Sequence, residues 1–313
     1  METARVLTET IKGKARGLGF AKVGIARADA LTEEGRRLQE WLSRSFHGTM
    51  SWMERNVEKR TDPRNIVPGA KSVISVAMNY YSDVQHSDDQ RVGKISRYAW
   101  GDDYHIVLTS RIQSLLDFIK SLQPQVHAKL YVDTGPVMDK AWAVRAGIGW
   151  LGKHTNVITK EFGSWVFLGE IILDLELEYD QPIEDFCGTC RACIDACPTG
   201  AIVDEYVLDS NTCISYLTIE HRGEIPNELK PDLENWVYGC DICQDVCPWN
   251  RFQQQTEEPA FLPREENIAP RLADLERISN EEFSRRFRKS PIKRTKREGL
   301  VRNARAVLES QQR

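Results

Sequence analysis

The chain has 313 residues, a formal net charge of −4, and a composition of 41% hydrophobic and 28% charged residues. This composition is typical of a globular protein, and the length suggests about two domains. The longest apolar runs, such as residues 165–173, are far shorter than the ~20 residues that span a bilayer, so we expect no membrane contact.

The first 180 residues alternate irregularly between helical and strand patterns, which predicts an α/β or α+β body. Apolar periodicity predicts helices over 3–18 and 30–43 and strands over 22–26, 71–81 and 128–132. Asp102 is the expected N-cap of a helix with Ile112, Leu115, Leu116 and Ile119 on one face. Pro136 should open a helix running to about residue 146, and residues 156–175 resemble a hairpin.

The C-terminal part is basic. Residues 257–270 are Pro-rich and are expected to form a linker, followed by two basic helices that are separated near Pro291. Residues 281–313 hold eleven Lys/Arg and four Asp/Glu, a balance of +7 against −11 for the rest. Such asymmetry is typical of nucleic-acid contact, although a solvated helix face would explain it equally well.

All eight cysteines lie between residues 187 and 247. The segment Cys-Gly-Thr-Cys-Arg-Ala-Cys-Ile-Asp-Ala-Cys-Pro starts at Cys187 and has the C-x₂-C-x₂-C-x₃-C-P spacing of two-cluster ferredoxins. Its fourth cysteine is expected to serve the other cluster. We therefore expect one 4Fe–4S cluster on Cys187, Cys190, Cys193 and Cys247. The second should be held by Cys197, Cys213, Cys240 and Cys243.

Zinc and disulfide bonds are the alternatives for these cysteines. Zinc sites use paired C-x₂-C units but not this four-cysteine run, and disulfides suit small secreted domains. No export signal precedes the chain, and iron–sulfur clusters are sensitive to oxygen. We therefore expect a cytoplasmic protein with two clusters.

Two other motifs suggest functions that their context does not support. Gly147-Ile-Gly-Trp-Leu-Gly152 fits the G-x-G-x-x-G template, but it follows a predicted helix and enters a strand, the reverse of a dinucleotide-binding unit. Asp133-Thr-Gly matches the triplet of aspartic proteases, which need a second such carboxylate. The sequence contains no second Asp-Ser/Thr-Gly.

Several motifs together resemble the epoxyqueuosine reductase family. They are Glu58-Lys-Arg60, Tyr98-Ala-Trp-Gly101 with Asp103-Tyr-His105, Val132-Asp-Thr-Gly135, Arg145-Ala-Gly-Ile-Gly-Trp150, Phe162-Gly-Ser164, and the cysteine block with Cys213-Ile-Ser-Tyr-Leu217. The resemblance covers roughly residues 1–250. It implies an α+β fold with a nitroreductase-like cobalamin-binding domain (1–180), a ferredoxin-like two-cluster domain (181–256), and a linker with a short basic helical tail (257–313).

The resemblance also implies a function, namely reduction of epoxyqueuosine to queuosine at the wobble position of tRNA. Cobalamin would be supplied with electrons by the clusters, and Asp133 would donate a proton, its pKa raised by an apolar cofactor face. Taken alone, Asp133 would more readily be a cap for the next helix. Carried over residue by residue, the implied cobalamin contacts are Arg60, Ser96, Arg97, Asp133, His154, Val157, Leu168, Ser215 and Arg222. His105 is a structural histidine by default.

The implied partners are a tRNA anticodon stem-loop with a GUN anticodon and an external electron donor of ferredoxin or flavodoxin type. We expect a monomer. Two alternatives remain: a corrinoid and iron–sulfur reductive dehalogenase, which would not bind RNA, and a plain electron-transfer ferredoxin, for which about 180 residues ahead of the clusters is excessive.

Overall fold

The structure is a computed structural model that describes residues 2–312. Its central element is a four-stranded sheet in the order β1-β2-β7-β4, in which each neighbouring pair is antiparallel. The strands are β1 (Lys22–Arg27), β2 (Ser72–Asn79), β4 (Ala128–Tyr131) and β7 (Val166–Leu173). β2 and β7 form the centre, in a register from Ser72 opposite Leu173 to Asn79 opposite Val166. Nearly every side chain of β2 is buried, because both faces of the sheet are covered.

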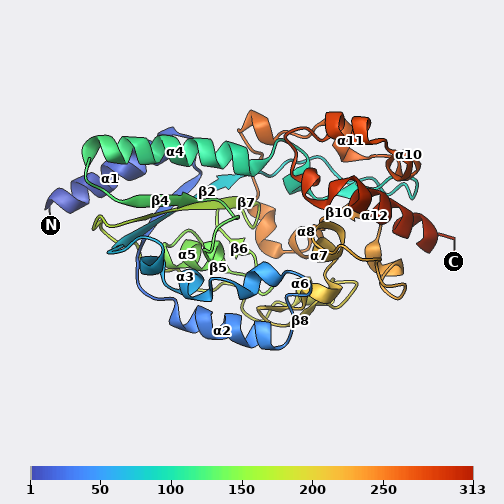
Figure 1. Ribbon diagram of the computed structural model, residues 1–313, viewed down its shortest axis with the longest axis horizontal. Coiled ribbons are helices and arrows are strands. Elements are labelled where there is room, and N and C mark those ends of the chain that lie inside the picture. Colours follow the sequence, from blue (N-terminus) through green and yellow to red (C-terminus); the bar gives the residue numbers. More distant parts are fainter. Residues whose placement is uncertain (1, 313) are drawn as a thin grey trace.

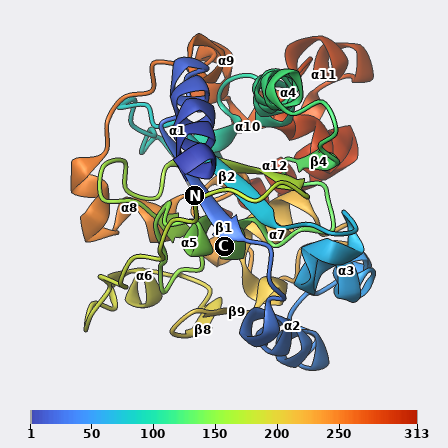
Figure 2. The ribbon, with the colours of Figure 1, turned by 90° about the vertical axis from the view of Figure 1, so that its left-hand side faces the viewer.

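Helices cover both faces of this sheet (Figures 1 and 2). α1 (Glu2–Gly17) and α4 (Tyr104–Leu122) lie on one face, whereas α5 (Asp139–Arg145) lies on the other, with α2 (Thr32–Ser43) and α3 (Val57–Thr61) beyond it. Successive side chains of a strand point to opposite faces. Ile74 and Val76 therefore join the core under α1 and α4, and Val73 and Ala77 join the core around α5.

The cysteine-rich region consists of short elements beside this body. α6 (Ala192–Asp195) and α8 (Ile242–Asp245) contact each other, and each begins within a C-x₂-C unit. A small hairpin, β8 (Ile202–Asp204) with β9 (Val207–Leu208), follows α6, and α7 (Ile214–Ile219) begins directly after Cys213. β10 (Trp236–Tyr238) pairs in parallel with β3 (Lys94–Ile95), so the first body and the cysteine region are joined by backbone hydrogen bonds.

The C-terminal segment packs into a third core. Its helices are α9 (Glu265–Ile268), α10 (Leu272–Arg277), α11 (Asn280–Arg286) and α12 (Lys296–Ser310). Leu300, Ala304 and Val307 of α12 are buried in one cluster with Trp236 and Tyr238 of β10. The basic segment is therefore part of the globular structure, and the separation of its two basic helices near Pro291 is confirmed.

The structure corrects four sequence-based expectations. Asp103, not Asp102, caps α4, because its carboxylate accepts the backbone N–H of His105. Pro136 does not open a helix, since α5 begins at Asp139. The strands expected to form one hairpin over 156–175 separate: β6 (Val157–Ile158) pairs with β5 (Trp150–Leu151), whereas β7 pairs with β2 and β4.

The fourth correction concerns the expected linker 257–270, which is packed rather than free. Phe261 is buried in the first core, and the side-chain amide of Asn267 donates to the carbonyl of Trp100. Across residues 2–312, none of the helices has the length and apolar character needed to cross a membrane.

Candidate functional site

The eight cysteines line two separate cavities, with four in each. A cavity of about 400 Å³, the large cavity, is lined by Cys197, Cys213, Cys240 and Cys243. A cavity of about 120 Å³, the small cavity, is lined by Cys187, Cys190, Cys193 and Cys247. All eight are free thiols, so no disulfide joins them. Each group has the number of thiols that one 4Fe–4S cluster requires, and the division is the same as that of the two ligand sets expected from the spacing.

The small cavity has aromatic walls and one buried cation. Trp249 and Phe186 line it together with Lys153, whose side chain is only 3% exposed. The Lys153 ammonium donates to the carbonyl of Gly188, between two cysteines, and to the carboxylate of Glu205, at 2.7 Å each. Burial raises the pKa of the Cys193 thiol to about 11, so a metal bound by this thiol would displace its proton.

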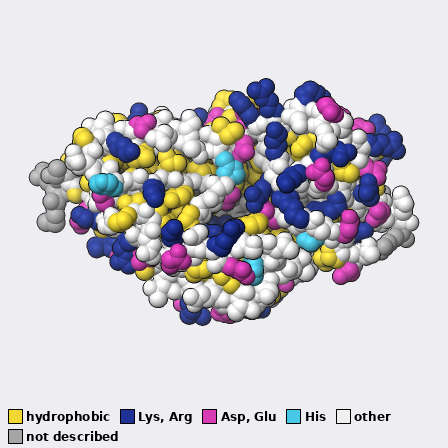
Figure 3. Space-filling view, in the orientation of Figure 1, with side chains coloured by type: hydrophobic (Ala, Val, Ile, Leu, Met, Phe, Trp, Pro, Cys, Tyr) yellow, Lys and Arg dark blue, Asp and Glu magenta, His cyan; other side chains and the backbone are white. Residues whose placement is uncertain are grey.

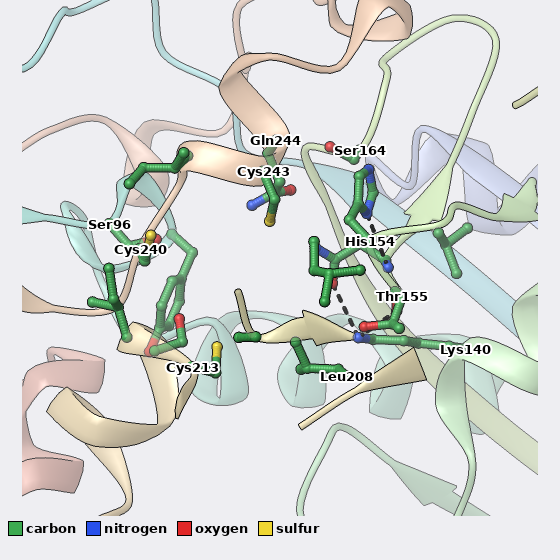
Figure 4. A pocket seen from close by; sticks show the side chains of 18 of the residues that line it. Ser96, Lys140, His154, Thr155, Ser164, Leu208, Cys213, Cys240, Cys243 and Gln244 are labelled. Atoms are coloured by element: carbon green, nitrogen blue, oxygen red, sulfur yellow. Dashed lines mark hydrogen bonds between the residues drawn. The ribbon is translucent and has the colours of Figure 1, made fainter. Parts of the chain in front are cut away.

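The large cavity lies between the sheet and the cysteine region and is mostly apolar. Cys213, Cys240 and Cys243 enter it from one side, and His154, Thr155 and Lys140 lie across from them (Figure 4). Its polar lining consists largely of neutral hydroxyl and amide side chains, from Ser96, Asn156, Ser164, Ser215 and Gln244. An apolar wall with scattered neutral hydrogen-bonding groups fits a corrin, a large ring with amide side chains at its rim.

Six of the nine expected cobalamin contacts line this cavity. They are Ser96, Asp133, His154, Val157, Leu168 and Ser215. Ser96 precedes a short helical turn at 97–99, and Asp133 follows β4. His154 lies between β5 and β6, and Val157, Leu168 and Ser215 lie in β6, β7 and α7. Segments far apart in sequence are thus brought to one place.

The three arginines among these expected contacts lie elsewhere. Arg97 is buried and donates to Asp241 and Asp245, at 3.3 Å and 2.8 Å. Arg60 donates to the carbonyls of Arg55 and Trp52, and Arg222 donates to backbone carbonyls that include that of Thr295. In this structure all three guanidinium groups are occupied by other parts of the chain.

Asp133 follows β4 and is held by two neighbours from α4. Its Oδ2 accepts the Tyr104 hydroxyl at 3.1 Å and lies 3.2 Å from His105 Nε2. His105 Nδ1 lies 2.8 Å from Asp103 Oδ1, so the imidazole is clamped between two carboxylates. The backbone of Asp133 has φ +57°, a left-handed conformation that costs energy and is concentrated at functional sites.

The electrostatics of this group differ from the expectation for Asp133. Burial raises the pKa of Asp133, but the hydrogen bond and charge of His105 and the Tyr104 hydroxyl outweigh it and leave the pKa below its ordinary value. Burial lowers the pKa of His105, yet its bonds to Asp103 and Asp133 raise it overall to about 9. Near neutral pH the pair is therefore an imidazolium and a carboxylate, and the proton resides on His105.

His154 lines both cavities, so it lies between the two cysteine groups. Its Nδ1 accepts the backbone N–H of Asn156 at 3.2 Å, which leaves the proton of the neutral ring on Nε2. That Nε2 is buried without a partner among the described residues, and burial lowers the pKa of His154 to about 4. His154 is therefore a neutral imidazole in the wall between the two cavities.

Sequence reasoning missed four residues of this site: Tyr104, His105, Asp139 and Lys140. Asp103-Tyr-His105 belongs to a motif of the family, but a lone histidine is structural by default. The contact between His105 and Asp133 joins residues 28 positions apart, so the sequence does not indicate it. The three glycines of 147–152 serve chain packing, since a Cβ on Gly149 would collide with the carbonyl of Ile158 and one on Gly147 with that of Gln181.

Together these features define an iron–sulfur protein in which an α+β body forms a ligand cavity against one of two four-cysteine groups. A sequence profile described as "Epoxyqueuosine reductase QueG, DUF1730" matches residues 60–134, and one described as "4Fe-4S double cluster binding domain" matches residues 186–250. The latter excludes the zinc alternative, and residues 186–250 are a double-cluster domain.

Relatives along the full chain agree. The epoxyqueuosine reductase of Cellulophaga algicola is 48% identical over 303 residues, 97% of this chain and 98% of that protein. That of Escherichia coli is 42% identical over 96% of this chain and 80% of its own length. A crystal structure of epoxyqueuosine reductase with an epoxyqueuosine-modified tRNA-Tyr stem loop has a TM-score of 0.91 at 37% identity, covering 97% of this chain and 81% of that one.

A Bacillus subtilis epoxyqueuosine reductase, whose catalytic aspartate loop is swung out of the active site, has a TM-score of 0.90 at 37% identity and covers the same shares. The chain belongs to the epoxyqueuosine reductase family. This membership decides against the two alternatives left by the sequence, a reductive dehalogenase and a plain electron-transfer ferredoxin.

Proposed function

We propose that this protein reduces epoxyqueuosine to queuosine at the wobble position of a tRNA with a GUN anticodon. Electrons would come from an external donor of ferredoxin or flavodoxin type and pass through two 4Fe–4S clusters to cobalamin in the large cavity. The observation that carries this proposal is that Asp133 and four cysteines line one cavity. A proton donor, an electron source and a space for cofactor and substrate thus meet.

The division of the cysteines between two cavities supports the proposed cluster ligands. Cys187, Cys190, Cys193 and Cys247 would hold the cluster of the small cavity, and Cys190 is exposed, which suits entry of electrons from a donor. Cys197, Cys213, Cys240 and Cys243 would hold the cluster that faces the cofactor.

Cobalamin would lie in the large cavity, in a body that we expect to be nitroreductase-like. Val157 and Leu168 would supply apolar contact, Ser96 and Ser215 would supply hydrogen bonds, and His154 would form part of the wall. When bound, it would collect two electrons and deliver them to the epoxide carbon. The chain's own part is to orient the ring, to exclude water with its apolar wall, and to deliver protons.

Proton delivery to the epoxide oxygen would start from the Asp133–His105 pair. Tyr104 and His105 both contact Oδ2 of Asp133. Oδ1 has no hydrogen-bond partner among residues 2–312, so it would be free to face the substrate. The proton stored on His105 would pass through Asp133 to the oxygen as its bond to carbon breaks. General acid catalysis of this kind typically contributes 10²–10⁴-fold.

The RNA would approach over the basic surface formed by Arg285, Arg288, Lys289, Lys293 and Lys296. These side chains are exposed, and Lys and Arg side chains gather over this half of the molecule beside a central hollow (Figure 3). The carbonyl of Lys289 accepts the backbone N–H of Asp103, the residue that clamps His105. Phosphate contacts at this surface would therefore fix the position of the RNA relative to the Asp133–His105 pair.

Other arginines of the segment serve the fold. Arg302 donates to the carbonyls of Leu217, His221 and Gly223, and Arg297 donates to that of Ile278. Deleting residues 281–313 would thus remove part of a core, so point variants are the sharper test of RNA contact.

The RNA test compares two triple variants. Replacing Arg285, Arg288 and Lys289 by Gln should weaken binding of an anticodon stem-loop and lower the slope of log affinity against log salt by roughly 2–3. The same change at Lys14, Arg16 and Lys120, exposed at the far end of the sheet, is the control. An unchanged slope in the first variant would place the RNA elsewhere.

Cofactor loading tests the metal part of the proposal. Anaerobic reconstitution should give about eight irons per chain, as two 4Fe–4S clusters require, together with one bound cobalamin, measured by iron analysis and visible spectra. Cys213→Ala should impair only the large-cavity cluster, and Cys190→Ala only the other. Four irons in the wild type, or a Cys213→Ala variant with both clusters intact, would refute the assignment.

A further inference from the structure

Reduction of an epoxide to an alkene consumes two protons. Both C–O bonds break, a C=C π bond forms, and the oxygen leaves as water. The complete reaction therefore consumes two electrons and two protons. The electrons are those of the proposed function, on which this inference rests. The Asp133–His105 pair holds one mobile proton, so the water that leaves needs a second donor near the same cavity.

A second pair of carboxyl groups lies beside the large cavity. Asp139, the first residue of α5, lines the cavity, and Glu170, in the middle of β7, is completely buried. α5 packs on β7, and each of the two carboxyls affects the pKa of the other as a hydrogen-bonding neighbour. The Ser75 hydroxyl of β2 donates to Glu170 Oε1 at 3.5 Å. Asp139 Oδ1 and Glu170 Oε2 are nevertheless buried without a donor among the described residues.

These two orphaned oxygens have a simple physical explanation. Two adjacent buried carboxyls resist being ionised together, because desolvation and mutual repulsion disfavour the second charge, so the resting pair retains one proton. A single proton held between them gives both groups a hydrogen-bond partner. Burial accordingly raises the pKa of Asp139, and burial together with the charge of Asp139 raises the pKa of Glu170.

The surroundings hold both charge signs. Lys140 of α5 and Arg60 of α3 face Asp139 and favour its ionised form, whereas Asp133 favours the protonated form of both carboxyls. The Lys140 ammonium itself is tied to the carbonyl of Thr155 at 2.8 Å and to Asn156 Oδ1 at 3.0 Å (Figure 4). The Lys140 cation is therefore held away from a direct bond to the pair. In these surroundings we expect the pair to carry one proton and one negative charge.

We propose that Asp139 and Glu170 share one proton and that Asp139 delivers it to the leaving oxygen as the second proton of the reduction. The first proton passes from His105 through Asp133 as the first C–O bond breaks. The second passes from Asp139 as the second C–O bond breaks, so that water leaves rather than hydroxide. The dianionic pair is then reprotonated from solvent through the cavity mouth, which restores the starting state.

The test has one readout that does not depend on activity. Infrared difference spectra between H₂O and D₂O, recorded on the holoprotein at pH 8, should show the C=O stretch of a protonated carboxylic acid. The band should disappear in Glu170→Gln, whose amide can donate to Asp139 but carries no acid proton. It should persist in Glu161→Gln, which removes a carboxylate that pairs with Lys22 at the surface.

Turnover gives the second readout. With a stem-loop RNA that carries epoxyqueuosine, single turnover should be slower by about 100-fold in Glu170→Gln, in line with loss of a general acid. RNA binding and both cluster EPR signals should be unchanged. Asp139→Asn should behave alike, and it is the variant to use if circular dichroism shows that Glu170→Gln is not folded.

A wild type without the infrared band, or a folded variant that loses the band and turns over at the wild-type rate, would overturn the proposal. A wild type that shows the band but does not reduce the RNA would instead refute the proposed function and leave the shared proton established. The two failures are therefore distinguishable.

Discussion

His105 Nε2 lies 3.2 Å from Asp133 Oδ2, and the same oxygen accepts a hydrogen bond from the Tyr104 hydroxyl. The bonds of His105 to Asp103 and Asp133 together raise the pKa of the imidazole to about 9, and the contact with His105 lowers the pKa of the Asp133 carboxyl. In the proposed function, the acid of the site would be this pair, with the proton on the histidine and the aspartate lining the cavity. The same contact gives the site its expected pH dependence.

His105 should set the alkaline limit of activity. Its pKa is raised in the folded protein, so its favourable interaction with Asp133 is fully present below the ordinary histidine value of about 6.5 and is lost as pH rises through about 9. Single-turnover rates should fall over that range. In His105→Gln the fall should begin at lower pH, because a carboxyl alone then carries the proton. His127→Gln, which breaks the similar His127–Asp174 pair at the surface, is the control and should keep the wild-type profile.

Asp133→Asn should lower single turnover by about 10²–10⁴-fold while RNA and cobalamin binding stay normal. Asparagine tolerates the left-handed backbone of φ +57° as well as aspartate does, so the fold should not suffer. Asp174→Asn, at the end of β7, supplies the matched control. Parent-like turnover in Asp133→Asn would make Asp133 a structural residue.

Lys153→Met should make the reduction potential of the small-cavity cluster more negative. A buried ammonium stabilises the added electron, and a unit charge several ångströms away at an effective dielectric constant of ~20 corresponds to roughly 50–100 mV. Lys160, which lies over the Phe186 ring but is exposed, is the control, because solvent screens its charge. EPR-monitored redox titration makes the comparison. Equal shifts in the two variants would argue against an effect of burial.

Leu300→Ala should destabilise the protein by about 2–5 kcal/mol, the usual cost of a cavity at a fully buried leucine. Val6→Ala, at an exposed position of α1, should change stability by less than about 0.5 kcal/mol. Thermal unfolding followed by circular dichroism compares them. A small effect at Leu300 would mean that the C-terminal segment is the loosely attached tail that its charge suggested.

The parts of the fold that follow local rules were predictable from the sequence. β1, β2 and β4 carry their strand pattern in consecutive residues, and the cysteine spacing indicates two clusters without any structure. The division of the cysteines between the two cavities is also as the spacing indicates, because each C-x₂-C unit and its partner follow from the connectivity of a two-cluster domain.

Long-range pairings were not predictable. Glu170 is a single charged residue in the apolar run 165–173, and nothing near it in the sequence indicates a partner. Asp139 lies 31 residues earlier and is brought to it only by the packing of α5 on β7. The packing of the basic tail was missed for a related reason. Leu300, Ala304 and Val307 have the spacing of a buried helix face, but the density of arginines around them indicated either nucleic-acid contact or a solvated face.

Mass spectrometry of an epoxyqueuosine-containing anticodon stem-loop, after anaerobic incubation with the reconstituted protein and a low-potential reductant, tests the central claim most directly. We predict that the modified nucleoside loses one oxygen atom and becomes queuosine, and that this requires both cobalamin and an intact Cys213. An RNA of unchanged mass after incubation with protein that holds about eight irons and one cobalamin would contradict the proposed function.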